Sequence, residues 1–347
     1  MHESVTCFAG WDIGGAHLKL AVADTQGRLL HVGQYPCRLW RGLHELDSLL
    51  SRLCQRWRLR GGLHGLTMTG ELADVFADRG EGVQTLLRMV VQHIDAKRMQ
   101  VYSLHRGLCD ARNARRAHAE VASANWHATA ASVAKIMPQA LLVDIGSTTT
   151  DIIPIRNGRV AARGLTDAGR LRTGELVYTG VARTPIMAVA RRVRFHGAWQ
   201  GLAAEHFAGM ADVYRLTGDL RYDGDETADR RGKNPRDCAR RLARMLGCDL
   251  RNASMKDWRR VARHIAGIQQ DDIAREMKRV MSQSSRLSKL PVVGAGVGRF
   301  IAKRLARRMG HTYIDYAELM DIPRRWRVHA AVCAPAVALA MLRQASC

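Results

Sequence analysis

A stretch near the middle of the chain combines two aspartates, a glycine and a run of hydroxyl side chains. Residues 141–155, LLVDIGSTTTDIIPI, place Asp144 at the end of one apolar run and Asp151 at the start of the next. Glycine permits a tight turn close to a ligand, and the amides and hydroxyls of such a turn aim donors into it. We therefore expect a bound anion, with Asp144 beside it as a ligand for Mg²⁺, which favours one or two carboxylates with phosphate oxygens. The donors of this turn are Gly146, Ser147, Thr148 and Thr149.

The same pattern occurs once near the start of the chain. Residues 8–20, FAGWDIGGAHLKL, contain Asp12, Gly14, Gly15 and Lys19 in matching places. A single turn of this kind is typical of an ordinary hairpin. Two copies favour duplicated halves that face each other across one phosphate group.

A third glycine cluster, VVGAGVG over residues 292–298, follows a predicted strand and begins a predicted helix. Its Gly294, Gly296 and Gly298 suit a loop whose backbone lies against a base, ribose or phosphate, next to the positive end of a helix. The alternative is tight packing between strand and helix. An NAD site is disfavoured, because no full βαβ unit follows the cluster.

The apolar runs in the sequence predict the strands and helices that position these turns. Short β-branched or apolar runs bounded by glycine and hydroxyl residues indicate strands, and leucines at helical spacing indicate helices. The predicted order is βββαβαβα over residues 1–138, beginning with a strand at 5–12, and it repeats over 139–327 around a largely helical insert at 164–290. A helix over 328–347 closes the chain. We expect an α/β fold with two duplicated actin-like, ribonuclease H-like domains.

The composition narrows the class of protein. The 347 residues are 47% hydrophobic, enough for two domain cores, and they show neither a signal peptide nor an apolar run long enough to span a membrane, so we expect a cytoplasmic protein without a membrane partner. Eight cysteines without a CxxC pair argue against structural zinc and against a disulfide scaffold.

The net charge is +22, from 54 basic and 32 acidic residues. Nucleic acid is nevertheless a disfavoured partner, because the basic residues are dispersed along predicted helices and aromatic residues make up only 5%. A positive field also attracts small polyanions such as diphosphates. Homo-oligomerisation is left open by the sequence.

The two turns, the glycine cluster and the duplicated order together resemble the superfamily of actin, sugar kinases and heat-shock chaperone ATPases. The resemblance implies that Asp12–Lys19 is a first phosphate loop, Asp144–Asp151 a second and Gly294–Gly298 an adenosine loop. ATP is therefore a possible ligand, although this fold specifies its reaction poorly.

A closer resemblance is to the hydantoinase/oxoprolinase-related family that is linked to tetrahydromethanopterin one-carbon transfer. Archaeal members of this kind act in methanofuran biosynthesis, where an aminomethylfuran diphosphate is joined to γ-glutamyltyramine. The family often has a threonine after the two glycines of the first loop, where this chain has Ala16. The segments that carry the resemblance are LTMTGELADVFADRGEGV (66–83), NWHATA (125–130), GRLRTGELVYTGVARTPI (169–186) and MADVYRLTGD (210–219).

This resemblance implies a transferase that condenses a furan diphosphate with a glutamylated tyramine or tyrosine phenol, forming an ether and releasing diphosphate. Asp12 and Asp144 would hold Mg²⁺, and the glycines and hydroxyls of both turns would hold the phosphates together with Lys19. The phenol also needs a base.

Two acidic residues are candidates for that base. Glu71 follows a predicted strand, where a carboxylate also serves as an ordinary helix N-terminal residue, and Asp151 also suits an ordinary turn aspartate. Tyr178 and Arg183 in the insert would bind the γ-glutamyl carboxylates.

Two other functions remain open at this stage. One is an ATP-dependent kinase or amidohydrolase of the same fold, although the chain is short for the amidohydrolase. The other is a nucleotide-sensing or filament-forming binding protein.

Overall fold

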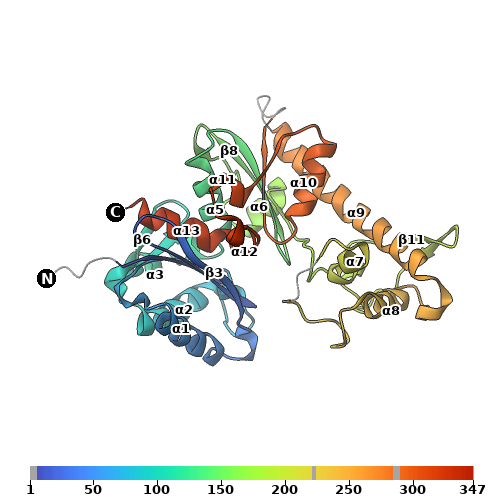
Figure 1. Cartoon of the computed structure of the whole chain (residues 1–347), viewed down its shortest axis with the longest axis horizontal. Helices are drawn as coiled ribbons and strands as arrows, with labels where there is room; N and C mark the ends of the chain where they lie inside the picture. Colours follow the sequence, from blue (N-terminus) through green and yellow to red (C-terminus); the bar gives the residue numbers. More distant parts are fainter. Residues whose placement is uncertain (1–5, 221–223, 284–289, 347) are drawn as a thin grey trace.

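The first half of the chain is built around a six-stranded sheet (Figure 1). The computed structural model describes residues 6–220, 224–283 and 290–346, so the first residue of the strand expected at 5–12 lies outside it. Strand β1 runs antiparallel to β2 and parallel to β4, and the sheet order is β3-β2-β1-β4-β5-β6. The strands are β1 (Phe8–Ile13), β2 (His17–Ala23), β3 (Leu29–Pro36), β4 (Leu63–Met68), β5 (Met99–Ser103) and β6 (Gly107–Asp110).

The second half repeats this pairing. Strand β7 runs antiparallel to β8 and parallel to β13, β13 runs parallel to β14, and the order is β10-β8-β7-β13-β14 with β9 also on β8. The α/β class and the duplicated actin-like arrangement are therefore confirmed. The strands are β7 (Ala140–Ile145), β8 (Thr150–Arg156), β9 (Arg159–Val160), β10 (Leu176–Val177), β13 (Val292–Ala295) and β14 (Tyr313–Asp315).

The register of the two equivalent hairpins places chemical groups opposite each other. Asp12 on β1 faces Lys19 on β2, and Asp144 on β7 faces Asp151 on β8. Directly opposed residues of an antiparallel pair carry their side chains on the same face of the sheet. Each hairpin therefore presents its own pair of ionisable groups to the space beside it.

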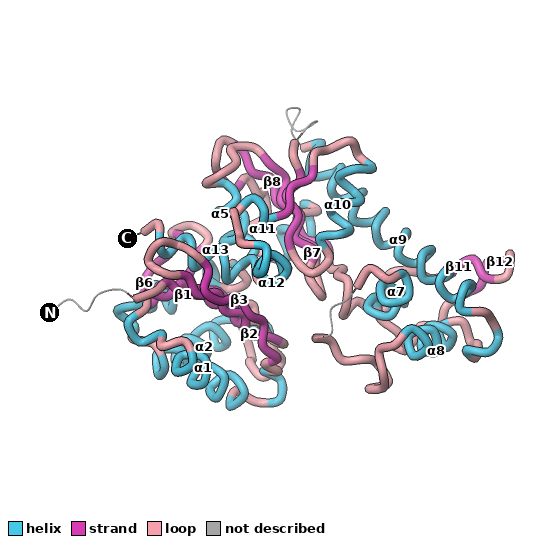
Figure 2. The backbone as a smooth tube through the Cα atoms, viewed as in Figure 1, coloured by secondary structure: helices cyan, strands magenta, loops and turns pink. Residues whose placement is uncertain are grey.

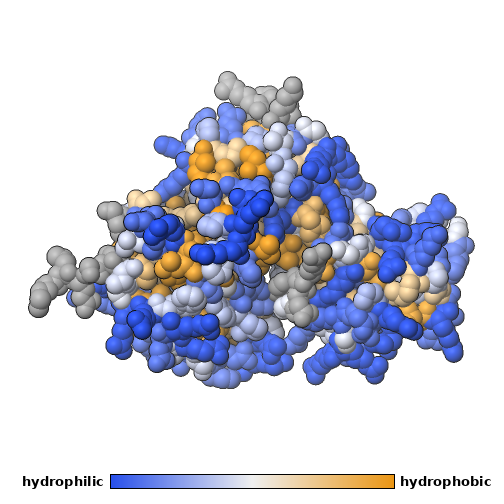
Figure 3. Space-filling view, in the orientation of Figure 1, coloured by the Kyte–Doolittle hydropathy of each residue, from blue (hydrophilic) through white to orange (hydrophobic). Residues whose placement is uncertain are grey.

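Helices cover the two sheets. On α1, leucines at helical spacing form the buried face, and the outer faces are hydrophilic, as the view over α1 and α2 shows (Figure 3). The helices outside the insert are α1 (His44–Arg56), α2 (Arg79–His93), α3 (Ala111–Arg116), α4 (His118–Val121), α5 (Asn125–Ala134), α10 (Arg299–Arg308), α11 (Tyr316–Leu319), α12 (Arg327–Val332) and α13 (Ala334–Gln344).

The insert extends from the second sheet to one side (Figure 2). Its long helix α9 buries Trp258 and Ile265 against α7 and α8, and this core is continuous with that of the second sheet. The insert contains α6 (Asp167–Thr173), the hairpin β11 (Arg192–Phe195)–β12 (Ala198–Gly201), α7 (Met210–Thr217), α8 (Pro235–Met245) and α9 (Met255–Ser282).

The closing segment differs from the single helix that the sequence predicts. It consists of α12 and α13 with Cys333 between them, and Pro335 stands in the first turn of α13. Proline cannot continue a helix from the preceding turn, because it lacks an N–H and its ring clashes with the carbonyl four residues earlier. Helix α13 packs on β1 and β4, where a side chain in place of Gly10 would overlap the carbonyl of Ala336.

Five strands also differ from the predicted pattern. Strands β6, β10, β11 and β12 have no counterpart in it, and the third strand of the repeated order is reduced to the two-residue β9. Strands of two to four residues are too short to show a periodic pattern. In the ranges that the structure covers, no helix is both long and apolar enough to cross a membrane.

Candidate functional site

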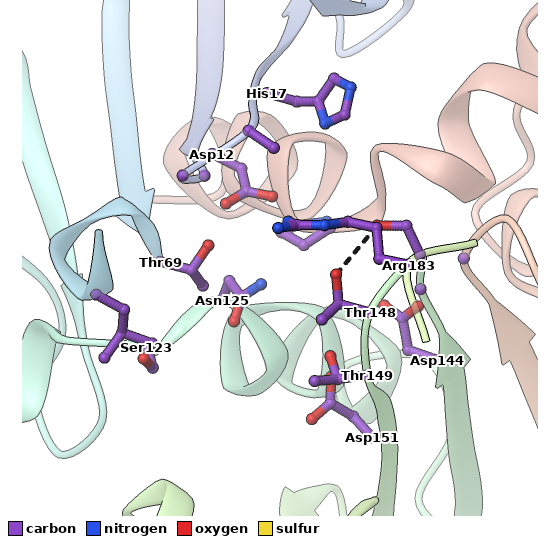
Figure 4. A pocket seen from close by; sticks show the side chains of 18 of the residues that line it. Asp12, His17, Thr69, Ser123, Asn125, Asp144, Thr148, Thr149, Asp151 and Arg183 are labelled. Atoms are coloured by element: carbon purple, nitrogen blue, oxygen red, sulfur yellow. Dashed lines mark hydrogen bonds between the residues drawn. The ribbon is translucent and has the colours of Figure 1, made fainter. Parts of the chain in front are cut away.

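A cavity of about 500 Å³ lies between the two halves and brings both polar turns together. Figure 4 shows Asp12 and the hydroxyls of Thr148 and Thr149 around the same space. Three further predicted residues, Glu71, Gly294 and Gly298, are not part of the lining. The predicted site residues that line the cavity are Asp12, Gly14, Gly15, Lys19, Asp144, Gly146, Ser147, Thr148, Thr149, Asp151, Tyr178, Arg183 and Gly296.

The first hairpin contributes an ion pair. The ammonium of Lys19 donates to Oδ2 of Asp12 at 3.0 Å, and Asp12 is almost fully buried. Burial opposes the charge of Lys19, but the Asp12 carboxylate outweighs it, so the pKa of Lys19 is raised and the side chain stays cationic. A partly buried cation beside glycine turns is suited to hold a phosphate oxygen.

The second hairpin contributes two carboxylates. Burial, with the nearby charge of Asp151, raises the pKa of Asp144 from its ordinary 3.8 to about 7. Burial also raises the pKa of Asp151, against the opposing effect of the Arg170 guanidinium that pairs with it. Two acids that share a low-dielectric site cannot both ionise at their ordinary pKa. Asp144 therefore exchanges protons near neutral pH.

Arg170, which the sequence reasoning missed, organises this side of the cavity. Its guanidinium pairs with Asp151, donates to Asp167 at 2.9 Å and stacks 4.4 Å from the ring centre of Trp126. Asp167 in turn pairs with Arg79 of α2 at 2.8 Å, so the network reaches the first half of the molecule. The segment GRLRTGELVYTGVARTPI, which carries the family resemblance, contains Arg170 and was the available signal.

The segment around Arg183 is fixed to the second turn by its backbone. The amides of Ala182 and Arg183 both donate to the carbonyl of Ser147, at 3.1 and 2.8 Å. The Arg183 guanidinium lies 6.0 Å from the ring centre of Trp40, which belongs to the first half. Tyr178 is 67% exposed, so it lies at the edge of the cavity and not within it.

Two glycines of the third cluster, Gly296 and Gly294, have different structural roles. Gly296 has a φ of +81°, and a side chain there would overlap Asp144 Oδ1 and the carbonyl of Ile145, so only glycine fits. Gly294 lies in the buried strand β13, where a side chain would meet the ring of Tyr313. The structure thus places Gly296 against the cavity and Gly294 in strand packing.

Glu71 lies behind the cavity wall. It is 1% exposed, burial raises its pKa, and it accepts a hydrogen bond of 2.9 Å from the hydroxyl of Ser123. Ser123 does line the cavity, together with Thr69 and Asn125. Sequence reasoning missed these three residues, although Asn125 begins the quoted segment NWHATA.

The insert also contacts the first turn. His17 Nε2 donates to the carbonyl of Gly224 at 3.1 Å, and Arg38 pairs with Glu226 at 3.1 Å. Burial lowers the pKa of His17 to about 4, so the ring is neutral at pH 7 and adds no charge to the phosphate region. Residues 224–226 of the insert therefore contact the first half of the molecule beside the first turn.

The carboxylates fit a divalent ion that is shared with phosphate. Asp12 Oδ1 is buried and has no hydrogen-bond partner in the described part of the chain, and Asp144 lines the same cavity. Among those residues, no group of three or more His, Cys, Asp or Glu side chains is placed to hold a metal ion. Mg²⁺ needs no such cage, because it keeps several waters and takes oxygens from substrate phosphates.

Comparison with known protein families shows which family the chain belongs to. The model of the hydantoinase/oxoprolinase family matches residues 63–346. The chain belongs to the hydantoinase/oxoprolinase family. Curated relatives of this family member include two archaeal proteins named (4-{4-[2-(γ-L-glutamylamino)ethyl]phenoxymethyl}furan-2-yl)methanamine synthase.

The two relatives cover most of their own length in the match. The protein of Methanocaldococcus jannaschii is 33% identical over 243 residues, 69% of this chain and 71% of the relative. The protein of Methanococcus vannielii is 29% identical over 206 residues, 58% of this chain and 89% of the relative. Because both are named as synthases, this hydantoinase/oxoprolinase family member is a transferase-like enzyme.

A solved structure supports the fold alone. The nucleotide-free structure of acetone carboxylase, from work on ATP-dependent acetone carboxylation, matches with a TM-score of 0.57 at 9% identity. The match covers 96% of this family member and 70% of the carboxylase chain.

Proposed function

We propose that this enzyme is a transferase of methanofuran-type cofactor biosynthesis. It condenses an aminomethylfuran diphosphate with the phenol of a γ-glutamyl tyramine or tyrosine, forms an aryl ether and releases diphosphate. The observation that carries the proposal is the pair of relatives named for a phenoxymethyl-furan product, combined with two phosphate-type turns on one cavity.

The chemistry asks the protein to stabilise a leaving diphosphate. The furan ring delocalises positive charge on the furfuryl carbon, so the main task is to hold negative charge as the carbon–oxygen bond breaks. Lys19 and the donors of both turns, with Gly14 and Thr148 as examples, would contact the phosphate oxygens. Asp12 and Asp144 would hold Mg²⁺, whose charge supports the leaving group when it is bound.

The second substrate would enter at the edge of the cavity that carries Tyr178 and Arg183. Its phenol must reach the furfuryl carbon beside the phosphate turns, and its γ-glutamyl carboxylates need cations. Arg183 supplies a guanidinium at that edge, and Tyr178 offers an exposed hydroxyl. Glu71 and Asp151 are the two candidate acceptors of the phenolic proton.

The test is a direct assay with purified protein, Mg²⁺, aminomethylfuran diphosphate and γ-glutamyltyramine. We expect equal amounts of diphosphate and of a phenoxymethyl-furan ether, detected by mass spectrometry. A parallel reaction with ATP and Mg²⁺ checks for ADP. ADP formation that depends on an acceptor, without an ether product, would contradict the proposal and identify an ATP-dependent enzyme; nucleotide-dependent assembly without turnover would identify a binding protein.

A further inference from the structure

The cavity has a second wall, opposite the turn that carries Asp144. Thr69, Ser123 and Asn125 line it and come from the first half, and Figure 4 shows them on the side away from Asp144. None of the three has the charge that a diphosphate needs. Unlike the backbone amides and cations around the two turns, their hydroxyl and amide oxygens can also accept a hydrogen bond from a neutral partner such as a phenol.

Ser123 has an unusual backbone for a residue with a side chain. Its φ is +52°, in the left-handed region, which costs roughly 1 kcal/mol or more for such a residue. Among the described non-glycine residues with positive φ, Ser123 is the one that lines the cavity. The preceding residue, Ala122, forms a bridge with Met68 at the end of β4, which fixes the conformation. Strain held in this way concentrates at functional positions.

The hydrogen bond of Ser123 has a definite direction. An ionised Glu71 can only accept, so the hydroxyl proton of Ser123 points to Glu71 Oε1 at 2.9 Å. The lone pairs of the Ser123 oxygen then remain available for a donor in the cavity. A phenolic O–H is such a donor.

Glu71 does not line the cavity itself and contacts the lining through the hydroxyl of Ser123. It is 1% exposed, and Gly82 of α2 lies so close that an added side chain there would stand 2.8 Å from the Glu71 Cβ. Burial raises the pKa of Glu71, which makes its carboxylate a stronger base than an exposed one. Burial also raises the pKa of Asp151, the other candidate, but its Oδ1 already accepts from the Arg170 guanidinium.

We propose that Ser123 receives the phenolic proton of the acceptor substrate and passes its own hydroxyl proton to Glu71. This inference rests on the proposed function and assigns the acceptor subsite within it. As the phenolic proton moves to the Ser123 oxygen, the phenol oxygen forms its bond to the furfuryl carbon. The carbon–oxygen bond to diphosphate breaks, and its electron pair leaves on the diphosphate. Glu71 ends protonated and returns its proton to water after product release.

The experiment compares two acceptors that differ in phenol acidity. One is γ-glutamyltyramine, whose phenol ionises near pH 10, and the other is a ring-fluorinated analogue that is already ionised near neutral pH. The variants are Ser123→Gly, which suits the positive φ, and Glu71→Gln, which keeps an oxygen for the Ser123 hydroxyl but is not a base. Thr69→Ala is the matched control, since Thr69 lines the same wall.

We expect kcat/KM of both variants to fall by about 10²-fold or more with γ-glutamyltyramine, and by less than about fivefold with the ionised analogue. Thr69→Ala should change kcat/KM by the same factor with both acceptors. Equal losses with both acceptors in Ser123→Gly and Glu71→Gln would overturn the relay while leaving the transferase intact. Absence of ether formation by the wild-type enzyme would instead overturn the proposed function itself.

Discussion

The two polar hairpins have the same backbone plan and opposite electrostatics. In each, an aspartate at the end of one strand faces an ionisable residue on the next, but Asp12 faces Lys19 and Asp144 faces Asp151. The first pair is neutral within its own hairpin. The second is doubly acidic and depends on a cation from elsewhere, Arg170 of α6. Duplicated folds can thus retain strand geometry while a single cross-strand position decides how each copy handles charge.

Because of this difference in charge, the second hairpin needs a residue of the insert at the cavity. The cation of the first hairpin is seven residues from its aspartate, whereas the cation of the second lies in the insert, 19 residues beyond Asp151. Arg170 also contacts Trp126 and, through Asp167, Arg79 of the first half. We infer that the insert, which lies outside the duplicated part, completes the second half of the site.

The largest expected effect tests whether both hairpins act on one substrate. Asp12→Asn and Asp144→Asn should each reduce ether formation by about 10³-fold or more, because each removes a carboxylate that would hold Mg²⁺, the cation that would stabilise the charge on the leaving diphosphate. The proposed transferase assay measures the loss, and circular dichroism shows whether the fold is kept. Asp271→Asn, which alters an exposed ion pair with Arg308, is the matched control and should retain activity. Full activity in Asp144→Asn would show that the second hairpin has no part in the chemistry.

The next expected effect is on stability, and it compares the cation of the second hairpin, Arg170, with that of the first, Lys19. Arg170→Met should destabilise the protein by about 3–5 kcal/mol at pH 8, because it leaves the largely buried carboxylate of Asp151 without its cation. Urea unfolding measures this change. Lys19→Met should cost less, since the Lys19 side chain is 24% exposed and water can reach the Asp12 site.

A double variant provides the control for Arg170. Arg170→Met with Asp151→Asn removes both the cation and one acid, and it should recover most of the lost stability. If the double variant is as unstable as Arg170→Met, the guanidinium acts through its packing on Trp126 and not through charge.

The contrast also shows what the sequence could and could not predict. The duplicated order and the meeting of both turns in one cavity were predictable, because glycine-hydroxyl turns between apolar strands are local signals. The pairing of Asp151 with Arg170 was not, since it joins residues on separate elements with no shared periodicity. The contact between Glu71 and Ser123 spans 52 residues and depends on the left-handed backbone of Ser123, which no local sequence pattern predicts.

The glycine cluster gives a second example of this limit. Gly294 and Gly296 are two residues apart, and the sequence treats them alike. Their roles differ because Gly294 is still within β13, against Tyr313, while Gly296 follows the strand end and lies against Asp144. Only the position of the strand end, which sequence patterns locate poorly, separates them.

A smaller expected effect is the pH dependence of stability that comes from the acidic pair Asp144 and Asp151. The folded-state pKa of Asp144, about 7, lies above its ordinary 3.8, so its contribution to stability is fully present below pH 4 and is lost as pH rises through 7. Asp144→Asn cannot ionise and escapes this loss. The variant should match the wild type near pH 4 and exceed it by roughly 2 kcal/mol at pH 8, less than the whole shift because the cavity admits water. Urea midpoints at both pH values measure the difference, and a pH-independent difference would contradict the raised pKa.

The smallest expected effect comes from the turns themselves. The second turn lines the cavity with the hydroxyl residues Ser147, Thr148 and Thr149, whereas the first has Ala16 at the place after its two glycines. Thr148→Ala should weaken binding of diphosphate with Mg²⁺ by about five- to tenfold, which corresponds to the net contribution of about 1 kcal/mol of a single hydrogen bond that water can replace. Ala16→Thr should strengthen it by a few-fold, because the new hydroxyl adds a donor beside Gly15, around which there is open space. Isothermal titration calorimetry measures both. If Ala16→Thr has no effect while Thr148→Ala weakens binding, the diphosphate lies closer to the second hairpin, and the duplicated turns do not share it equally.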